Sequence, residues 1–455
     1  MSTQSTTPKS VIIVGGSLAG LMHALVFLSL PSPPKVRILE RSPTALLHDQ
    51  GAGVVAGSET QEFFAKYVRP GRDIAVTSPM RHYLNRKGDV MPETVKHQTQ
   101  RMTSWDLLYH LLRWRVEGRE SGHTQGLEMD DRPKAQYENG CTVTGIADEP
   151  EGARLTWTQH DRGEQSAIAD LVIAADGASS TIRKLLSPTV ERQYVGYVGW
   201  RGTCPETELS EAAREVFIER FTFYHTDGNQ ILGYVIPGRD GTLEPGKRLF
   251  NWVWYCNSAD GSPEHEDLMT GNDGKRHAIT LPVGAMKDSV WKKQQEYAAE
   301  ILPPQFAEAV RKTEQPFVQA ITDVISPQNS FMNGKVLLVG DSLAGFRPHT
   351  AASTGQAAFD ALTLGQWMNG ETTKEKYDEK VLEFAQRLQH HGVVLGERTF
   401  GACIVGNPHS PVPMARVNLT CLSARRYMKM RATSGVLFVF DDTLNGDVLN
   451  STSKA

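Results

Sequence analysis

The sequence predicts an α/β fold in which a parallel-sheet domain is interrupted by a mixed or antiparallel β-sheet domain and followed by C-terminal helices. A β-branched run over 10–14, a glycine-rich turn, a helix pattern over 18–30 and a strand over 36–40 form a βαβ unit, which is typical of parallel sheets. Short aromatic strands alternate with turns over 194–256, as in antiparallel sheets. A buried strand pattern returns late, over 335–340, and is expected to complete the first domain.

These changes of pattern divide the chain into four parts. Residues 10–190 are expected to form the first part of the parallel-sheet domain, and residues 331–400 its closing part. Residues 191–330 are expected to form the β-rich domain, and residues 401–455 a C-terminal segment. A chain of 455 residues is long enough for about three domain-sized units.

The remaining elements follow from hydrophobic periodicity and from turn residues. The expected helices cover 105–116, 178–186, 351–368 and 373–396. The expected strands are a hairpin over 141–158, a buried strand over 171–175, and aromatic strands over 194–200, 217–225, 230–235 and 249–255.

Composition excludes several classes of protein. Hydrophobic residues make up 40% of the chain and charged residues 22%, which excludes disordered and collagen-like proteins. The formal net charge is −4, so there is no electrostatic reason to expect a nucleic-acid partner. Residues 11–30 carry no charge, but they contain three glycines and a histidine, so we expect no integral membrane segment.

The cysteines and histidines show no metal-binding pattern. The five cysteines are scattered and form no Cys-x-x-Cys pair, so neither a disulfide framework nor a zinc site is expected. Unpaired cysteines favour a reducing compartment, and we expect the chain in the cytoplasm.

The turn after the first strand is expected to bind a pyrophosphate. Glycines allow a tight turn and a close approach to phosphate, and the free N–H groups of a helix N-terminus favour negative charge. Glu40 ends the second strand, where a carboxylate would accept hydrogen bonds from ribose hydroxyls, and Arg41 follows it. Because a serine replaces the usual second glycine, a tight turn without a ligand is the alternative. The turn residues are Gly15, Gly16, Ser17, Leu18, Ala19 and Gly20.

Two further motifs place an aspartate at the end of a buried strand. Asp176 follows the strand over 171–175, with Arg183 on the next helix, and Gly340-Asp341 follows the strand over 335–340. A carboxylate at such a strand end is well placed to hold sugar hydroxyls. The alternative for each aspartate is a cap on the helix that follows.

Together the three motifs resemble those of the FAD-dependent aromatic hydroxylases, the group A flavoprotein monooxygenases of the 4-hydroxybenzoate hydroxylase type. The resemblance covers residues 10 to about 365. The phrases Gly199-Trp-Arg-Gly202 and Arg347-Pro-His349 are most similar to the 2,6-dihydroxypyridine 3-hydroxylase branch. The resemblance implies a Rossmann-like FAD-binding domain of the glutathione-reductase type, with FAD held non-covalently and NAD(P)H as co-substrate.

The resemblance also implies which residues contact FAD. Many family members carry an arginine at the position of Ser104, and Arg101 lies just upstream, so Arg101 is a candidate to replace it. The flavin loop departs from the usual pattern because Gly355 is its only glycine. The implied contacts are Gly15 to Gly20, Glu40, Arg41, Arg101, Asp176, Arg183, Gly340, Asp341, Pro348, Ala351 and Gly355.

In such enzymes NAD(P)H reduces the flavin, O₂ adds at its C4a carbon, and the hydroperoxide transfers OH to an electron-rich hydroxy- or amino-aromatic ring. The cofactor performs the difficult step, while the protein orients the ring and excludes water. The substrate is expected between the flavin and the β-rich domain. For each candidate contact the alternative is packing within the sheet or an internally hydrogen-bonded histidine. The candidates are His225, Tyr234, Trp254, Arg201 and His349.

Other readings of the sequence remain open. Related flavin chemistry includes oxidative decarboxylation of a 4-hydroxy- or 4-aminobenzoate and epoxidation of a secondary metabolite. Trp252-Val-Trp254 mimics the start of the flavin halogenase signature, but the residues that follow it differ. A non-catalytic nucleotide-binding or redox-sensing protein is the alternative from another class. The oligomeric state is also open, with a homodimer among the options.

Overall fold

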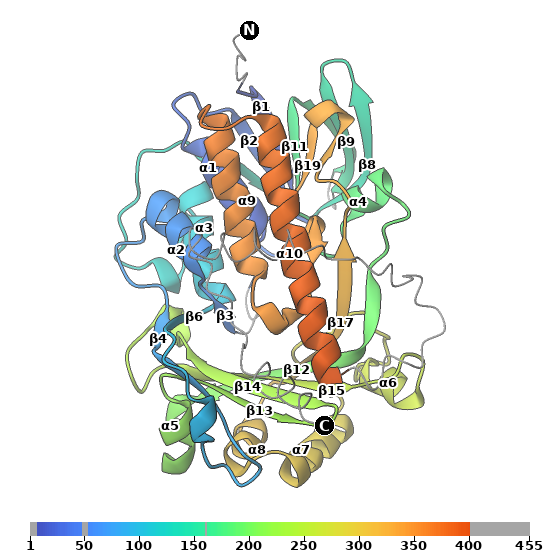
Figure 1. Cartoon of the computed structure of the whole chain (residues 1–455). Coiled ribbons are helices and arrows are strands. Elements are labelled where there is room, and N and C mark those ends of the chain that lie inside the picture. The colour runs from blue at the N-terminus through green and yellow to red at the C-terminus, as the bar shows by residue number, and fades with distance from the viewer. Residues whose placement is uncertain (1–6, 48–52, 160–161, 401–455) are drawn as a thin grey trace, which may run out of the picture.

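Two large β-sheets and the helices that cover them form the molecule (Figure 1). The computed structural model describes residues 7–47, 53–159 and 162–400, so the predicted segment over 401–455 lies outside the described residues. One sheet is largely parallel and lies beside α9 (Ser353–Met368) and α10 (Lys374–Phe400), which run side by side in front of it. The second sheet crosses below their ends. The predicted α/β class, with a β-rich part interrupting a Rossmann-like part, is confirmed.

The first sheet has six strands, and all its neighbouring pairs are parallel except the pair β18–β19. Residues 11–14 of β1 are buried on both faces, as a covered parallel sheet requires. In order across the sheet the strands are β18 (Ser330–Phe331), β19 (Val336–Leu338), β11 (Leu171–Ala174), β1 (Ser10–Val14), β2 (Lys35–Leu39) and β7 (Gln136–Glu138).

The uncharged segment over 11–30 is an internal strand and helix. α1 (Leu18–Leu28) packs against α9 and α3 (Trp105–Glu117), and all of its residues but Ala19 are buried. A helix enclosed on all sides needs no polar face, which explains why the sequence looks like a membrane span. Within 7–47, 53–159 and 162–400, no helix is long and apolar enough to cross a bilayer.

Two small antiparallel sheets flank this core. The predicted hairpin is confirmed as β8 (Cys141–Glu149) and β9 (Gly152–Gln159), and β10 (Gly163–Ala169) extends it. The other small sheet lies near α2 (Ser58–Phe63) and carries part of the candidate site described below. Its strands are β3 (Gly53–Val55), β6 (Gln100–Ser104) and β4 (Val76–Ser78).

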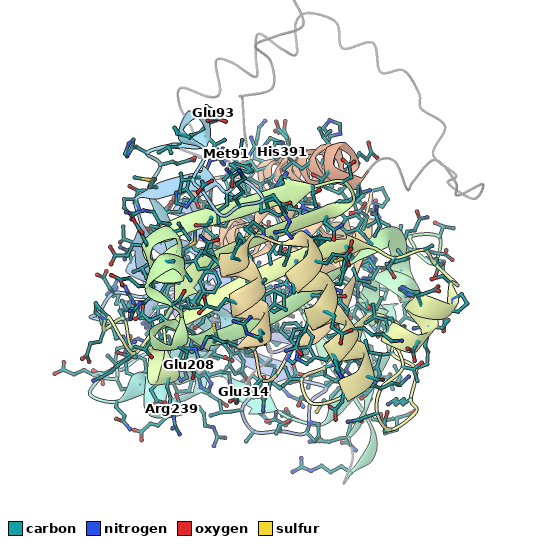
Figure 2. The ribbon with its side chains drawn as sticks, turned by 90° about the horizontal axis from the view of Figure 1, so that it is seen from below. Met91, Glu93, Glu208, Arg239, Glu314 and His391 are labelled. Atoms are coloured by element: carbon teal, nitrogen blue, oxygen red, sulfur yellow. The ribbon has the colours of Figure 1, made fainter. Side chains whose placement is uncertain are left out.

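The second large sheet is mixed, because its strand pairs are antiparallel except for β13 with β5. Figure 2 shows α7 (Asp288–Ile301) and α8 (Pro304–Arg311) lying across one face of it. α5 (Glu211–Phe217), α4 (Thr181–Leu186) and α6 (Pro263–Leu268) are short peripheral helices. The strands are β16 (Thr280–Leu281), β17 (Phe317–Ile325), β12 (Gln193–Pro205), β15 (Leu249–Asn257), β14 (Asn229–Ile236), β13 (Arg220–Thr226), β5 (Met80–Tyr83) and, paired with β17, β20 (Ala344–Gly345).

The alternation of side chains separates the two faces of this sheet. Trp200 pairs across the strands with Trp254, and both rings lie against α7, near Trp291 and Tyr297 respectively. Successive residues of a strand point to opposite faces, so Arg201 lies on the face away from α7. That second face looks toward the parallel-sheet part of the molecule and forms one wall of the candidate site.

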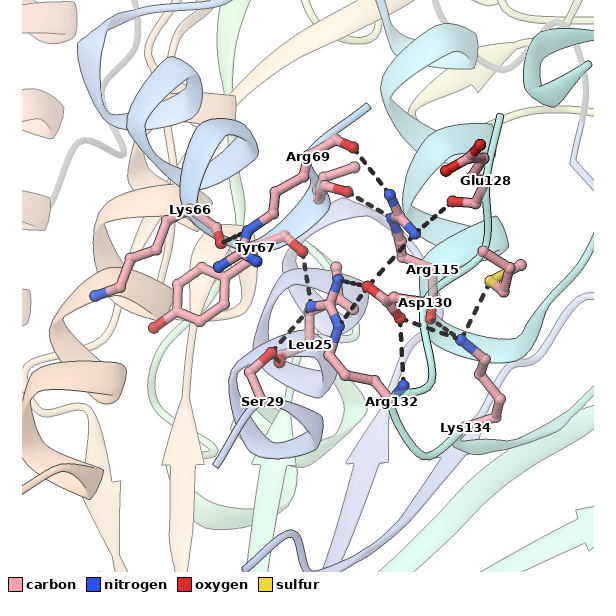
Figure 3. Close-up of polar contacts among 12 residues, drawn as sticks. Leu25, Ser29, Lys66, Tyr67, Arg69, Arg115, Glu128, Asp130, Arg132 and Lys134 are labelled. Carbon is pink, nitrogen blue, oxygen red and sulfur yellow. Dashed lines mark hydrogen bonds and ion pairs between the residues drawn. The ribbon is translucent and has the colours of Figure 1, made fainter. Parts of the chain in front are cut away.

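A cluster around Asp130 joins the end of α1 to the segment after α3 (Figure 3). Arg132 donates to Asp130, to the Ser29 hydroxyl at 3.0 Å and to the Tyr67 carbonyl at 2.7 Å. Arg115 lies 3.4 Å from the Asp130 carboxylate. Burial alone would raise the pKa of Asp130, but the surrounding cations lower it below its usual value. The charged groups of Arg115 and Arg132 are therefore paired within the protein, and the cluster stabilises the fold.

Candidate active site

The glycine turn after β1 has the geometry of a phosphate-binding turn. Gly15 has a φ of +99°, a conformation that side chains disfavour. A Cβ placed at Gly20 would lie only 1.9 Å from the Gly15 carbonyl oxygen. Ser17 precedes α1 without capping it through its side chain, so the first N–H groups of the helix remain available to an anion.

Glu40 organises this turn from the end of β2. Its carboxylate accepts hydrogen bonds from the Gly16 N–H and the Ser42 N–H, both at 2.8 Å. The carboxylate therefore lies beside the turn, as a ribose-binding acid would. Arg41, the next residue, is exposed.

We expect Glu40→Ala to weaken FAD binding by about 1–3 kcal/mol, because the Gly16 N–H of the turn and the Ser42 N–H after β2 lose their acceptor. Titration of the apoprotein with FAD, followed by flavin fluorescence, measures the change. Glu40→Gln keeps one acceptor oxygen and should lose less affinity. Unchanged affinity in Glu40→Ala would remove this residue from the cofactor site.

The structure brings the three sequence motifs together at one edge of the parallel sheet. A Cβ at Gly15 would lie 2.4 Å from the Ala175 carbonyl oxygen, and one at Gly340 would lie 2.8 Å from the Ala19 Cβ. A Cβ at Gly345 would likewise lie 2.9 Å from the Ala178 Cβ. Motifs that are far apart in sequence are thus in van der Waals contact, which predicts one shared ligand.

In the second motif the hydrogen bonds of Asp176 cap a helix. Its carboxylate accepts from the Thr181 N–H at 2.7 Å and from the Ser180 hydroxyl at 2.5 Å. Arg183 donates to the Ser342 carbonyl at 2.6 Å and to the Ala178 carbonyl. Arg183 therefore ties the second motif to the backbone of the third, and the helix-cap alternative describes the contacts of Asp176.

Two side chains of α9 fix the backbone of the third motif. The buried carboxyl group of Asp360 accepts the Gly340 N–H through Oδ2 at 2.8 Å, and the buried Gln356 amide donates to the Gly340 carbonyl at 2.9 Å. Gly340 is thereby fixed with a φ of +55°. This arrangement positions the next residue, Asp341, at the wall of a cavity.

That cavity lies between the third motif and the free face of the second sheet. On the motif side it is lined by Asp341, Pro348, His349 and the 351–354 segment. On the sheet side its apolar lining comes from Phe221, Leu232, Val253 and Ile321, and its polar lining from Arg201, Tyr234 and Tyr255. Mostly apolar walls with a few convergent polar groups are typical of a small-molecule site.

Comparison with known proteins identifies the kind of site. A family model described as FAD binding domain-like matches residues 194–323. The 2,6-dihydroxypyridine 3-monooxygenase of Paenarthrobacter nicotinovorans is 30% identical over 411 residues, which cover 85% of this chain and 94% of that protein. The chain belongs to the FAD-dependent monooxygenase family.

One further relative and one solved structure support this monooxygenase assignment, and a second solved structure shares the fold. The FAD-dependent urate hydroxylase of Klebsiella oxytoca is 27% identical over 255 residues, 52% of either chain. The structure of 2,6-dihydroxypyridine-3-hydroxylase from Arthrobacter nicotinovorans has a TM-score of 0.74 and 26% identity, over 89% of this chain and 96% of that chain. Klebsiella pneumoniae HpxO, complexed with FAD and uric acid, shares the fold, with a TM-score of 0.64 at 18% identity over 94% of this chain and 93% of that one.

The residues of this monooxygenase fit FAD at a second point besides the glycine turn. A second cavity lies across the loop over 350–355 and shares Val55, Ala351 and Ala352 with the first. Gln100 lines it, and this side chain is only 6% exposed while neither of its amide atoms has a hydrogen-bond partner. A buried amide left unpaired is costly, so the cavity suits a ligand with both donors and acceptors, as FAD has.

Two of the five candidate substrate contacts, Trp254 and His225, do not line the first cavity. Trp254 is fully buried on the α7 face, where its Nε1 donates to Asn229 at 3.1 Å. His225 shares the cavity face but is exposed at the end of β13, against Tyr83 and 2.7 Å from the Gln230 amide. Trp254 therefore points away from the first cavity, and His225 lies at the end of its strand, outside the lining of that cavity.

Arg201, Tyr234 and His349 do line the cavity. Burial, Arg347 and His225 lower the pKa of His349 to about 3, so its ring is neutral near pH 7. Its Nε2 lies 2.7 Å from the Tyr197 hydroxyl. A neutral imidazole that is already hydrogen-bonded can orient a ligand but is a weak base.

Arg101 has partners other than a cofactor. Its guanidinium donates to the Thr77 hydroxyl at 2.6 Å and pairs with Asp73 at 3.1 Å, although the residue also lines the second cavity. The hypothesis that Arg101 contacts the flavin therefore requires it to leave these partners. Ser104, at the position where the resemblance implies an arginine, caps α3 by accepting the Leu107 N–H.

Four residues of the candidate site were not predicted from the sequence. Tyr255 and Arg192 line the first cavity, while Asp360 and Gln356 hold Gly340. Asp360 had a visible signal, because it is a lone acid in an apolar helix five positions after Gly355. Tyr255 follows Trp254 on β15 and points to the opposite face of the sheet, so assigning that face to the cavity would have predicted Tyr255 as a lining residue.

Proposed function

We propose that this monooxygenase uses NAD(P)H and O₂ to hydroxylate an electron-rich hydroxy- or amino-aromatic compound. The observation that carries the proposal is the cavity that runs from Asp341 and Pro348 to Arg201, Tyr234 and Tyr255. It joins the expected cofactor loop to a sheet face that is both aromatic and cationic. The names of the relatives, which refer to dihydroxypyridine and urate, support a ring substrate of this size.

The cofactor would lie along the three motifs. The first turn of α1 and Glu40 would hold its ADP half, and Asp341 would hold the ribitol chain. Burial raises the pKa of Asp341, while Arg192, Ser353 and Arg183 act to lower it. When bound and reduced by NAD(P)H, FAD supplies the activation of O₂ and the transfer of one oxygen atom.

The substrate ring would lie on the sheet face. Phe221, Leu232 and Val253 give it an apolar surface and exclude water. Burial raises the pKa of Tyr255 to about 12 and raises that of Tyr234 further, against the opposing effect of Arg201. Both tyrosines are therefore neutral hydrogen-bond donors at pH 7, and they can orient a ring oxygen or nitrogen.

The loop between the two cavities has the properties of a hinge for the flavin ring. Its residues over 350–355 are small, and Ala351 has a φ of +50°, which is strained for a residue with a side chain. Cavities border the loop on both sides. A flavin ring held over this loop would have room for two positions. It would then meet NAD(P)H mainly when the aromatic ring is bound.

We therefore expect a true substrate to speed NAD(P)H oxidation at least about tenfold, which is about 1.4 kcal/mol of barrier. Stopped-flow reduction of the holoenzyme with and without a substituted phenol, hydroxybenzoate, aminobenzoate or hydroxypyridine measures the effect. Equal rates with product formed would contradict control of reduction by substrate. Failure of every aromatic compound to yield an oxygenated product would contradict the proposed function.

Product mass distinguishes the proposed hydroxylation from oxidative decarboxylation. Hydroxylation adds one oxygen atom to the substrate, whereas oxidative decarboxylation also releases CO₂. The same reactions analysed by mass spectrometry decide between these outcomes.

A further inference from the structure

Gly16 is held on both sides by side chains from neighbouring strands of the parallel sheet. Its N–H donates to the Glu40 carboxylate at 2.8 Å, and its carbonyl oxygen accepts a hydrogen bond from the Tyr137 hydroxyl at 3.1 Å. Tyr137 lies on β7 beside Ile38 of β2. Both side chains therefore reach the glycine turn from the edge at which these two strands end.

The position of Tyr137 explains why residue 16 is a glycine. Unlike Gly15, Gly16 does not have a positive φ, so its backbone conformation does not require glycine. A Cβ at Gly16 would lie 2.0 Å from the Tyr137 hydroxyl oxygen and 2.5 Å from Cζ of the same ring. The phenol thus fills the space that a side chain at this position of the turn would need.

The ring of Tyr137 is held in place by α3. The guanidinium carbon of the fully buried Arg113 lies 3.6 Å from the ring centroid, where a cation is attracted to an aromatic face. Arg113 is itself fixed, because it donates to the Glu117 carboxylate and to the Ala45 carbonyl, both at 2.9 Å. Burial raises the pKa of Tyr137, against the lowering effect of Arg113, so its hydroxyl keeps the proton near pH 7.

The hydrogen bond from Tyr137 also fixes the direction of the next N–H group. The peptide between Gly16 and Ser17 is trans, and in a trans peptide the C=O and the N–H point in opposite directions. With the Gly16 carbonyl held by Tyr137, the Ser17 N–H is turned away from this tyrosine. Ser17 is the residue before α1, and N–H groups at such a helix start bind phosphate.

We propose that Tyr137 is a positioning residue for FAD, which directs the Ser17 N–H toward the pyrophosphate by holding the Gly16 carbonyl. The inference rests on the proposed function, since it assumes that the ADP half of FAD lies along this turn. Tyr137 and Arg113 hold the turn in one conformation before the cofactor binds, which lowers the entropy cost of binding.

The test compares Tyr137→Phe with wild type, as apoproteins titrated with FAD, ADP and adenosine. This variant keeps the ring beside Arg113 and loses only the hydroxyl. We expect it to weaken FAD and ADP at least about fivefold, and adenosine, which has no phosphate, less than about twofold. Flavin fluorescence gives the dissociation constant of FAD, and displacement of FAD gives the other two.

Tyr194→Phe is the matched control. The Tyr194 hydroxyl also donates to a backbone carbonyl, that of Ser258 at 2.6 Å, but it does so on the mixed sheet. This control should bind all three ligands as wild type does. Urea denaturation of both apoproteins checks that each variant is folded.

A second comparison tests the close contact itself. We expect Gly16→Ala to weaken FAD more in the wild-type background than in a Tyr137→Val background, where the new Cβ no longer meets the phenol. Such a difference is the coupling between the two residues. Equal losses in the two backgrounds would overturn the inference.

Unchanged constants for FAD and ADP in Tyr137→Phe would also overturn it. So would an equal loss for adenosine, because the hydroxyl would then serve the adenosine part and not the phosphates. If ADP does not displace FAD from wild type, the proposed placement of the cofactor fails first. If ADP displaces FAD and Glu40→Ala weakens both ligands while Tyr137→Phe weakens neither, only the role of Tyr137 fails.

Discussion

Gly20→Ala should abolish FAD retention and lower the free energy of unfolding by about 3 kcal/mol. The new Cβ would lie 1.9 Å from the Gly15 carbonyl oxygen and 3.2 Å from the Ile13 Cγ2. Backbone atoms cannot yield as a flexible side chain does, so α1 must move away from β1. That movement opens the turn that is expected to hold the pyrophosphate.

Flavin absorbance of the purified protein and urea denaturation measure the two effects. Gly145→Ala is the matched control, since its new Cβ would meet nothing closer than the Thr156 Cβ at 3.5 Å. We expect the control to change stability by less than about 0.5 kcal/mol. A yellow Gly20→Ala protein with the wild-type midpoint would contradict the close approach of α1 and β1.

Asp360→Asn should make stability less dependent on pH. Burial raises the pKa of Asp360 to about 8, against the lowering effect of the Gly340 N–H and Gln356. The unfolded chain releases this proton near its usual pKa of 3.8, so between about pH 4 and pH 8 the folded state holds a proton that the unfolded state has lost. Wild type should therefore lose about 1.4 kcal/mol per pH unit in that window relative to the variant.

The sign follows from the raised pKa. The contribution of Asp360 is fully present below pH 4, and it is lost as pH rises toward 8. The difference between variant and wild type should change by about 4 kcal/mol between pH 5 and pH 8, which urea midpoints at several pH values measure. Gln356→Leu removes the neighbouring hydrogen bond without a titratable group, so its destabilisation should vary far less with pH. A constant difference for Asp360→Asn would show that the carboxyl group is not buried as a neutral acid.

The local signals of the parallel sheet were strong enough to predict it from sequence. The apolar run over 11–14, the turn at Gly15 and the carboxylate of Glu40 each depend on neighbours close in the chain. The structure brings Gly15, Ala175 and Gly340 together because the carboxyl ends of adjacent parallel strands meet at one edge. Strand order made this convergence predictable once the three strands were assigned.

The wall of the cavity was harder to predict because both faces of its sheet are apolar. Trp254 and Tyr255 are adjacent and both buried, so composition does not show which residue faces the cavity. The packing of α7 determines which residue faces the cavity, because Tyr297 of α7 stacks on Trp254 and covers that face of the sheet. Trp254 and Tyr297 are far apart in the sequence, so the local pattern of β15 could not predict their contact.

The partners of charged side chains were equally hard to predict from the sequence. Arg101 of β6 is paired with Asp73, which lies in the segment just before β4, and Asp176 caps the helix that begins at Thr181. The helix-cap alternative for Asp176 was visible in the sequence, whereas the ion pair of Arg101 depends on how β4 and β6 align. The sequence therefore predicts where backbone positions such as Gly15 lie better than it predicts the partners of long, flexible side chains.

The pairing of β11 with β19 determines when a newly made chain can hold its cofactor. Val172 lies beside Val336 in the parallel sheet, and the whole of the mixed sheet apart from β5 and β20 is encoded between them. During synthesis the strands of the mixed sheet between β11 and β19 are therefore made before β19, which carries the third motif of the candidate nucleotide site. Pairings so distant in sequence form slowly, and the chain emerges at about 5–20 residues per second. If FAD lies along the three motifs as proposed, it would bind late, to a nearly complete fold, and would not be a nucleus around which the N-terminal half assembles.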